Sequence, residues 1–157
     1  MSINLKLLDR QIIEIMQKDA RQPSSSIAAQ IGQSERTVRQ RIRKLVNSGV
    51  IQPVVVVNPD AFNYGMVVDI FCQVDNALRD QVLSAVTRLP EITYTAFTTG
   101  DQDIVLQARF KSSADMHEFI THRLYQIPGM GRTHTVLVPA ILKETYQWLP
   151  PPEAFDS

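Results

Sequence analysis

Basic and amide side chains recur in the segment 34–47 at intervals that place them along one side of a helix. Arg36, Gln40 and Arg43 fall opposite the apolar Val38 and Leu45 when each residue advances by about 100° around the axis. Guanidinium and amide groups donate hydrogen bonds to phosphate oxygens and to the edges of base pairs. The pattern therefore predicts a helix whose outer face binds the major groove of double-stranded DNA.

Positions near the start of such a helix reach the bases, and positions farther along contact the phosphates. The residues expected at this interface are Ser34, Arg36, Thr37, Arg39, Gln40, Arg43 and Lys44. Ser34 is expected to cap the helix, Arg36, Thr37 and Gln40 to contact bases, and the last three cations to contact phosphates. The alternative is a basic face that binds only water, and the helix that precedes it across a short turn argues against that alternative.

Apolar residues repeat every three or four positions in three segments of the first half, which is typical of amphipathic helices. These segments are 5–18, 24–32 and 34–49, and Ser24–Ser26 offer hydroxyls to cap the second of them. A glycine-containing turn joins the second and third segments, which makes them a helix-turn-helix. The apolar run 50–57 that follows is predicted to be a strand, like a wing.

The second half of the chain alternates strand and helix patterns in the order βαββαβ. Strands are expected at 66–74, 92–99, 104–110 and 133–142, and helices at 78–89 and 116–124. This is the ferredoxin-like order, in which two helices pack on one face of a four-stranded antiparallel sheet. Because no further element covers the other face, we expect a homodimer through the sheet.

The fold class expected from these elements is α+β. The turn formers Asn58, Pro59 and Asp60 mark the main boundary. We expect a winged helix-turn-helix domain at 1–50, a strand and linker at 51–62, a ferredoxin-like regulatory and dimerisation domain at 63–149, and a frayed tail at 150–157.

The formal net charge of the 157 residues is zero, with 16 basic and 16 acidic side chains. The charge is unevenly divided, because residues 1–60 hold nine Lys or Arg against five Asp or Glu, and the remainder holds seven against eleven. The two parts therefore carry net charges of +4 and −4. Such asymmetry predicts an acidic partner for the first part only.

Composition and spacing predict neither an enzyme nor a metal site. A lone Cys72 cannot form an intramolecular disulfide, and it suits a reducing cytoplasm. His117 and His122 are five positions apart, which turns their imidazoles away from one another on a helix. No Ser or Cys nucleophile has a recognisable partner motif. No secretory signal or membrane span is visible, so we expect a soluble cytoplasmic protein with no catalytic residue, no metal and no cofactor.

Both halves resemble one known family, the Lrp/AsnC (feast/famine) transcription regulators. In the first half the resemblance lies in Leu8-Asp9-Arg10, Ile12-Ile13, Ile27-Ala28, Ile31-Gly32-Gln33-Ser34, Val38, Arg41-Ile42, Leu45 and Gly49-Val50-Ile51. In the second half it lies in Thr99-Gly100-Asp101-Gln102-Asp103-Ile104-Val105-Leu106, Ile127-Pro128-Gly129 and Arg132-Thr133-His134-Thr135-Val136-Leu137-Val138. It covers nearly the whole chain in order, so it is far more specific than a helix-turn-helix alone.

The resemblance implies a transcription regulator that dimerises through the second domain, assembles further into tetramers of dimers and responds to an amino acid. In that family the effector binds between dimers near a Gly-Asp-x-Asp loop. Carried over to this sequence, the ligand-binding residues are Gly100, Asp101 and Asp103, with Thr98, Thr133 and Thr135 as neighbours. Carboxylates suit the ammonium of an amino acid, and hydroxyls or backbone amides suit its carboxylate.

Three alternatives to these expectations stay open. Gly100 and Asp101 can form an ordinary hairpin turn with no ligand. The chain can be an amino-acid sensor that does not bind DNA, although the intact basic helix face argues against that. It can also resemble siroheme decarboxylases, enzymes of the same two-domain arrangement, but few His and Arg are present to bind the propionates of a tetrapyrrole. The Gln102 between the two loop acids replaces the usual aromatic residue of the family.

Overall fold

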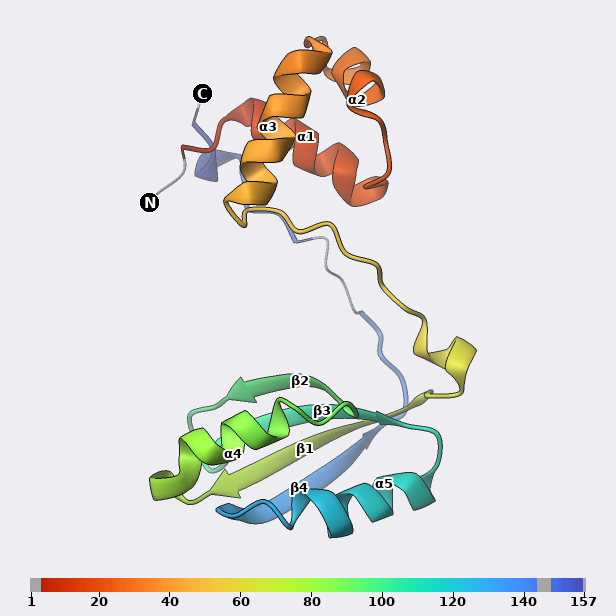
Figure 1. Ribbon diagram of the computed structural model, residues 1–157, viewed down its shortest axis with the longest axis vertical. Helices are drawn as coiled ribbons and strands as arrows, with labels where there is room; N and C mark the ends of the chain where they lie inside the picture. Colours follow the sequence, from red (N-terminus) through yellow and green to blue (C-terminus); the bar gives the residue numbers. More distant parts are fainter. Residues whose placement is uncertain (1–3, 144–147, 157) are drawn as a thin grey trace. The chain divides into compact units, whose positions relative to one another are not determined.

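A computed structural model describes residues 4–143 and 148–156. The described chain forms two compact units (Figure 1), one made of residues 4–56 with 148–156 and the other of residues 57–143. The first unit is helical, and the second is a four-stranded sheet with helices on one face, so the expected α+β class is confirmed. No helix among these residues has the length and apolar character needed to cross a bilayer.

The helical unit contains α1 (Leu7–Lys18), α2 (Ser24–Ile31) and α3 (Glu35–Asn47). Their apolar stripes meet in one core, and Ile12, Ile27 and Val38 contribute side chains with no exposed surface. Gly32 ends α2 with a φ of 66°, a left-handed conformation that glycine adopts without steric cost. The predicted helix-turn-helix is therefore confirmed.

Two local predictions in this unit are wrong. Pro23 precedes the first residue of α2 as its N-cap, and no side chain caps that helix, so Ser24–Ser26 lie inside the helix rather than before it. The expected strand at 50–57 is also missing, because residues 51–58 have no regular structure and Val54–Val57 are exposed. The β-branched run has the composition of a strand, but no neighbouring strand of this chain pairs with it.

The C-terminal segment packs against the helical unit, so the expectation of a frayed tail at 150–157 is wrong for the described part, 150–156. Phe155 is only 7% exposed and belongs to the same core as α1. The backbone N of Leu7 donates to the carbonyl of Asp156 at 3.0 Å, and the N of Asp156 donates to the carbonyl of Leu5 at 2.7 Å. Arg10 donates to the carbonyl of Pro150 at 2.6 Å.

These contacts also change the expected domain boundaries. The sheet unit runs from residue 57 to 143 rather than from 63 to 149, and Leu149 packs with the helical core. The linker expected at 51–62 is divided between the two units. A short 3₁₀ turn, η1 (Pro59–Phe62), begins the sheet unit, and another, η4 (Pro152–Ala154), lies in the C-terminal segment.

The sheet unit has the expected βαββαβ order. Its elements are β1 (Met66–Val74), the 3₁₀ turn η2 (Asn76–Leu78), α4 (Arg79–Val86), β2 (Ile92–Phe97), β3 (Ile104–Phe110), α5 (Ser113–Phe119) with its π-helical continuation η3 (Ile120–Leu124), and β4 (Met130–Val138). The antiparallel strand order is β2-β3-β1-β4. The last strand lies earlier than the predicted 133–142, since Pro139 follows it and has no N–H to donate to the sheet.

The two faces of the sheet differ in burial. Val68, Ile70 and Cys72 of β1 have no exposed surface and lie in the core with α4 and α5. Asp69 and Phe71 alternate with them and are partly exposed on the other face, where Phe71 pairs with His134 of β4. No element of the described chain is packed on that other face in Figure 1.

Candidate nucleic-acid interface and effector loop

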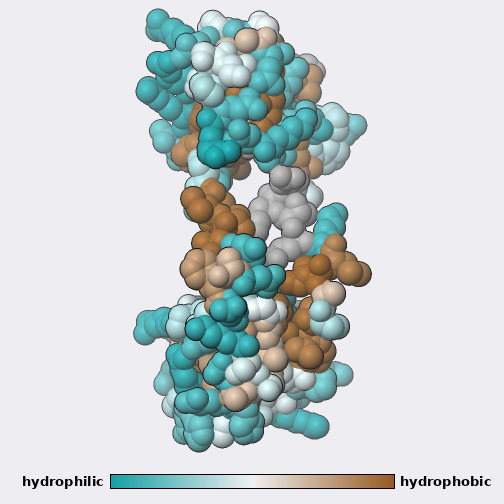
Figure 2. All heavy atoms as spheres, turned by 90° about the vertical axis from the view of Figure 1, so that its right-hand side faces the viewer, coloured by the Kyte–Doolittle hydropathy of each residue, from teal (hydrophilic) through white to brown (hydrophobic). Residues whose placement is uncertain are grey.

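The outer face of α3 is basic and open to solvent, as predicted. Arg36, Arg39, Gln40 and Arg43 are all exposed, and together with Glu35 they line one shallow depression. Val38 and Leu45 are buried on the opposite side of the helix, which fixes the basic side outward. The face of the helical unit seen in Figure 2 is mainly hydrophilic, with smaller hydrophobic patches. A helix of this kind can insert into a groove and contact a polyanion.

The start of α3 is capped by two of the predicted residues. The backbone N of Thr37 donates to Ser34 Oγ at 3.1 Å, and the Ser34 and Thr37 hydroxyl oxygens lie 2.8 Å apart. Ser34 therefore has the capping role predicted for it. The Thr37 hydroxyl is engaged with this cap and is only partly exposed.

The predicted phosphate contacts are not equivalent. The Arg39 guanidinium forms an ion pair with Glu35, one turn earlier on the same helix. Arg36 and Arg43 have no ion-pair partner within residues 4–143 and 148–156, and Lys44 is exposed in the last turn. Two of the guanidinium groups are thus available to an anion without breaking a contact.

Sequence reasoning missed one arginine of α3 that faces inward. Arg41 lies 3.5 Å from the buried carboxylate of Asp9 in the first turn of α1. The signal that could have found this contact is the position of Arg41 beside the apolar stripe, three residues after Val38. This side chain connects α3 to α1 instead of facing a partner.

The Gly-Asp-x-Asp loop joins β2 to β3, and much of its polar chemistry is used within the sheet unit. Asp103 Oδ2 accepts from the backbone N of Val74 at 2.8 Å. The Thr98 hydroxyl donates to the carbonyl of Gln102 at 2.7 Å, and the carbonyl of Asp101 accepts from Gln73 Nε2 at 3.0 Å. Gly100 is exposed and has a φ of 136°, which favours glycine.

A small pocket of about 270 Å³ lies beside this loop, lined by Gln73, Gln102, Arg132, Thr133 and His134. Of the six predicted ligand-binding residues only Thr133 lines it, and the Thr133 hydroxyl oxygen also lies 2.7 Å from that of Tyr125. Thr135 pairs with Ile70 in the sheet and lies outside the pocket. The missed members Arg132 and His134 sit two residues apart on β4, an alternation that marks them as sharing a face.

Cys72 and the histidines show no sign of a metal or catalytic role. Burial raises the pKa of the Cys72 thiol to about 12, so the reactive thiolate does not form at neutral pH. In the part of the chain that the structure describes, no group of three or more His, Cys, Asp or Glu side chains could hold a metal ion.

Two family models match the chain, one for each half. A model described as "Winged helix-turn-helix DNA-binding" matches residues 5–52. A model described as "Lrp/AsnC ligand binding domain" matches residues 66–148. The first match contains α3 with its basic face, and the second contains all four strands and the loop.

Relatives and solved structures agree with these matches. The "HTH-type transcriptional regulator FL11" of Pyrococcus abyssi is 38% identical over 92% of this chain and 96% of its own length. The structure of AsnC from E. coli has a TM-score of 0.86 at 24% identity, covering 92% of this chain and 99% of that one. A Neisseria meningitidis regulator, NMB0573 in complex with L-Met, has a TM-score of 0.87 at 22% identity, covering 94% and 97%.

These relatives are transcription regulators rather than enzymes, which agrees with the sequence-based expectation. The basic face of α3 and the matches over both halves lead to one conclusion: this chain belongs to the Lrp/AsnC family of DNA-binding transcription regulators.

Proposed function

We propose that α3 recognises a specific operator, with Arg36 and Gln40 reading base edges and Arg43 and Lys44 contacting phosphates. The observation that supports this most is the exposed row of Arg36, Gln40 and Arg43 behind a helix start fixed by Ser34. Thr37 and Arg39 take part by giving up their contacts with Ser34 and Glu35.

Binding to a DNA fragment that contains the gene's own promoter, measured at two salt concentrations, tests this proposal. Phosphate contacts release counterions, so affinity falls steeply as salt rises. Arg36→Ala is expected to weaken specific binding, while Arg88→Ala, an exposed arginine of the sheet unit, is the matched control. Binding that is indifferent to salt, or equal loss in both variants, contradicts the proposal.

The small-molecule effector is proposed to be an amino acid bound at the loop, near Gly100, Asp101, Asp103 and Thr133. Arg132 in the adjoining pocket can bind its carboxylate, and the Gln73 and Gln102 amide oxygens can accept from its ammonium. The match to a ligand-binding domain supports a ligand in this unit, and the related Neisseria structure contains L-Met.

A panel of amino acids in a thermal-shift assay tests the effector proposal, because a ligand that binds the folded state raises the melting temperature. Arg132→Ala should abolish any shift, while Asp103→Ala removes the cap on Val74 and also lowers the basal melting temperature. An unchanged shift in Arg132→Ala places the effector elsewhere.

The open face of the sheet is proposed to bind a second copy of the chain, and these dimers to assemble into a tetramer of dimers. Tyr94 of β2 is 56% exposed and Val136 of β4 is 39% exposed, and Phe71 and Val105 lie on strands between them. Val136→Asp is expected to shift the mass in light scattering toward the monomer, whereas Ser84→Asp on α4 should not.

A further inference from the structure

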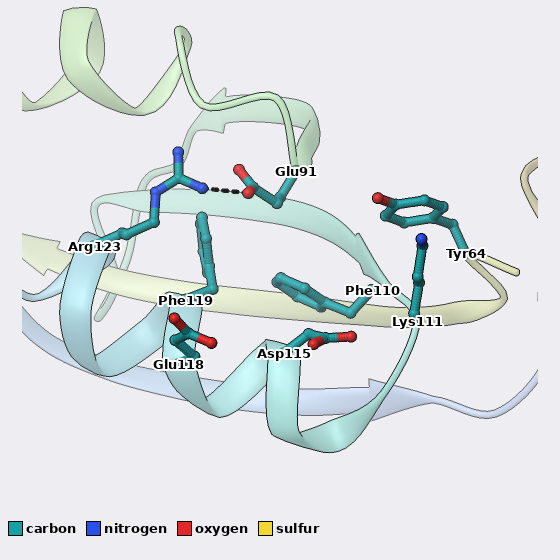
Figure 3. Close-up of a pocket in the computed structure, with 8 residues that line it drawn as sticks. All are labelled: Tyr64, Glu91, Phe110, Lys111, Asp115, Glu118, Phe119 and Arg123. Carbon is teal, nitrogen blue, oxygen red and sulfur yellow. Dashed lines mark hydrogen bonds and ion pairs between the residues drawn. The ribbon is translucent and has the colours of Figure 1, made fainter. Parts of the chain in front are cut away.

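A second pocket, of about 360 Å³, lies on the helix-bearing side of the sheet unit and shares no residue with the loop or its pocket. It has the size of a small-ligand site. Figure 3 shows the residues that line it: Tyr64, Glu91, Phe110, Lys111, Asp115, Glu118, Phe119 and Arg123.

Two phenylalanine rings form the apolar middle of this pocket. Phe110 of β3 and Phe119 of α5 are 2% and 3% exposed, and their ring centroids lie 5.2 Å apart. In Figure 3 these rings lie between Lys111 and Tyr64 at one end and Arg123 at the other. An aliphatic chain can lie across them without losing contact area to water.

One positive and one negative charge of the pocket already neutralise one another. The Arg123 guanidinium pairs with Glu91 and lies 5.5 Å from the Phe119 ring centroid. The second oxygen of Glu91, Oε2, is buried and accepts no hydrogen bond from the described chain. A buried acceptor of this kind is stabilised by a donor that enters the pocket.

The remaining charges have no partner of opposite sign in residues 4–143 and 148–156. Lys111 Nζ lies 5.0 Å above the Tyr64 ring and forms no ion pair, and neither do the carboxylates of Asp115 and Glu118 on α5. The unpaired groups are therefore one cation and two anions. A complementary ligand carries one anionic and two cationic groups.

We infer that this pocket binds a basic amino acid, such as lysine or arginine. The ligand carboxylate pairs with Lys111 and its α-ammonium with Asp115, while its methylenes cross Phe110 and Phe119. The distal cation then donates to Glu91 Oε2 and Glu118. This inference goes beyond the proposed operator binding and the loop effector, because it concerns a separate site.

Isothermal titration calorimetry on the full chain with three matched probes tests the inference. Lysine carries all three charges, norleucine lacks the distal ammonium, and cadaverine lacks the carboxylate. Lysine should bind at least about tenfold more tightly than either analogue, since each removes a charge-assisted contact.

Variants locate the site. Lys111→Met and Glu118→Gln, both at exposed positions, should each weaken lysine binding by about tenfold, with Lys111→Met leaving cadaverine binding unchanged. Asp80→Asn on α4 outside the pocket is the control, and Arg132→Ala reports on the loop pocket. Melting temperatures check that every variant is folded.

Three results overturn the inference: no binding of lysine or arginine at millimolar concentration, equal binding of norleucine, or loss of lysine binding in Arg132→Ala alone. The last result leaves the loop effector proposal standing. Operator binding by the ligand-free wild type is measured separately, so failure of the DNA proposal is distinguished from failure of this one.

Discussion

Arg41 of α3 and Asp9 of α1 form a contact of 3.5 Å between Nη1 and Oδ2 in the interior of the helical unit. Asp9 is 1% exposed, and the same Oδ2 accepts from the backbone N of Lys6 at 2.9 Å. Its Oδ1 is buried with no partner in the described chain. The charge of Asp9 is thus balanced mainly by an arginine of the helix that faces DNA, which couples the orientation of α3 to α1.

Asp9→Ala should destabilise the protein by about 1–3 kcal/mol, because it removes the cap of α1 and leaves the guanidinium of Arg41 partly buried without its partner. Denaturant unfolding followed by circular dichroism measures the change. The control is Glu14→Ala, which breaks the surface pair with Arg10 and should cost less than about 1 kcal/mol. Equal effects would show that the interior pair does not stabilise the unit.

Glu35→Gln should tighten binding to DNA of any sequence by about two- to fivefold, because it frees Arg39 and removes a negative charge from the basic face. Fluorescence anisotropy with a random duplex at low salt measures this. The gain should shrink at high salt, since screening weakens contacts between exposed charges and phosphates. Weaker binding would mean that Glu35 has a favourable role at the interface.

Phe155→Ala should lower the free energy of unfolding by about 2–4 kcal/mol, because a buried aromatic ring leaves a cavity beside α1. Hydrogen exchange should show faster opening of the first turn of α1, where the backbone of Leu7 bonds to Asp156. Trp148→Ala is the comparison, since that side chain is 75% exposed. A silent Phe155→Ala would show that the C-terminal segment adds no stability.

Cys72 predicts a loss of stability at high pH. The pKa of its thiol is raised by burial from 9.0 to about 12, so the unfolded chain releases this proton at lower pH than the folded chain does. The stability that the neutral thiol contributes is present below pH 9.0 and is lost as the pH rises toward about 12. Comparing wild type with Cys72→Ala from pH 7 to 10.5 isolates this contribution, and parallel curves would contradict it. The native thiol should also resist iodoacetamide at pH 8.

The strands could be predicted from the sequence wherever the pattern of burial is local. Residues 66–74 and 104–110 form β1 and β3 with the expected bounds, because alternating apolar residues pack against two helices. The run 50–57 has the same β-branched character, yet strand formation also requires a neighbouring strand, and that requirement cannot be read from local composition.

The site was predictable by residue type more than by hydrogen bonding. The basic face of α3 follows from helical periodicity alone, so Arg36, Gln40 and Arg43 are exposed where expected. Asp103 has the residue type of a ligand-binding acid, but the structure uses it to bind the backbone of Val74. The packing of Phe155 lacks any periodic signal, because it depends on the shape of α1 some 140 residues earlier in the chain.

The docking of the C-terminal segment makes the sheet unit an insertion within the helical unit. A fragment cut after residue 60, the obvious choice for isolating a DNA-binding domain, would lack Phe155 and expose the part of the core that it covers. A faithful minimal unit would instead join residue 56 to residue 148 by a short linker. During synthesis the helices of the DNA-binding unit emerge first, but their core is completed only after all four strands of the sheet have been made.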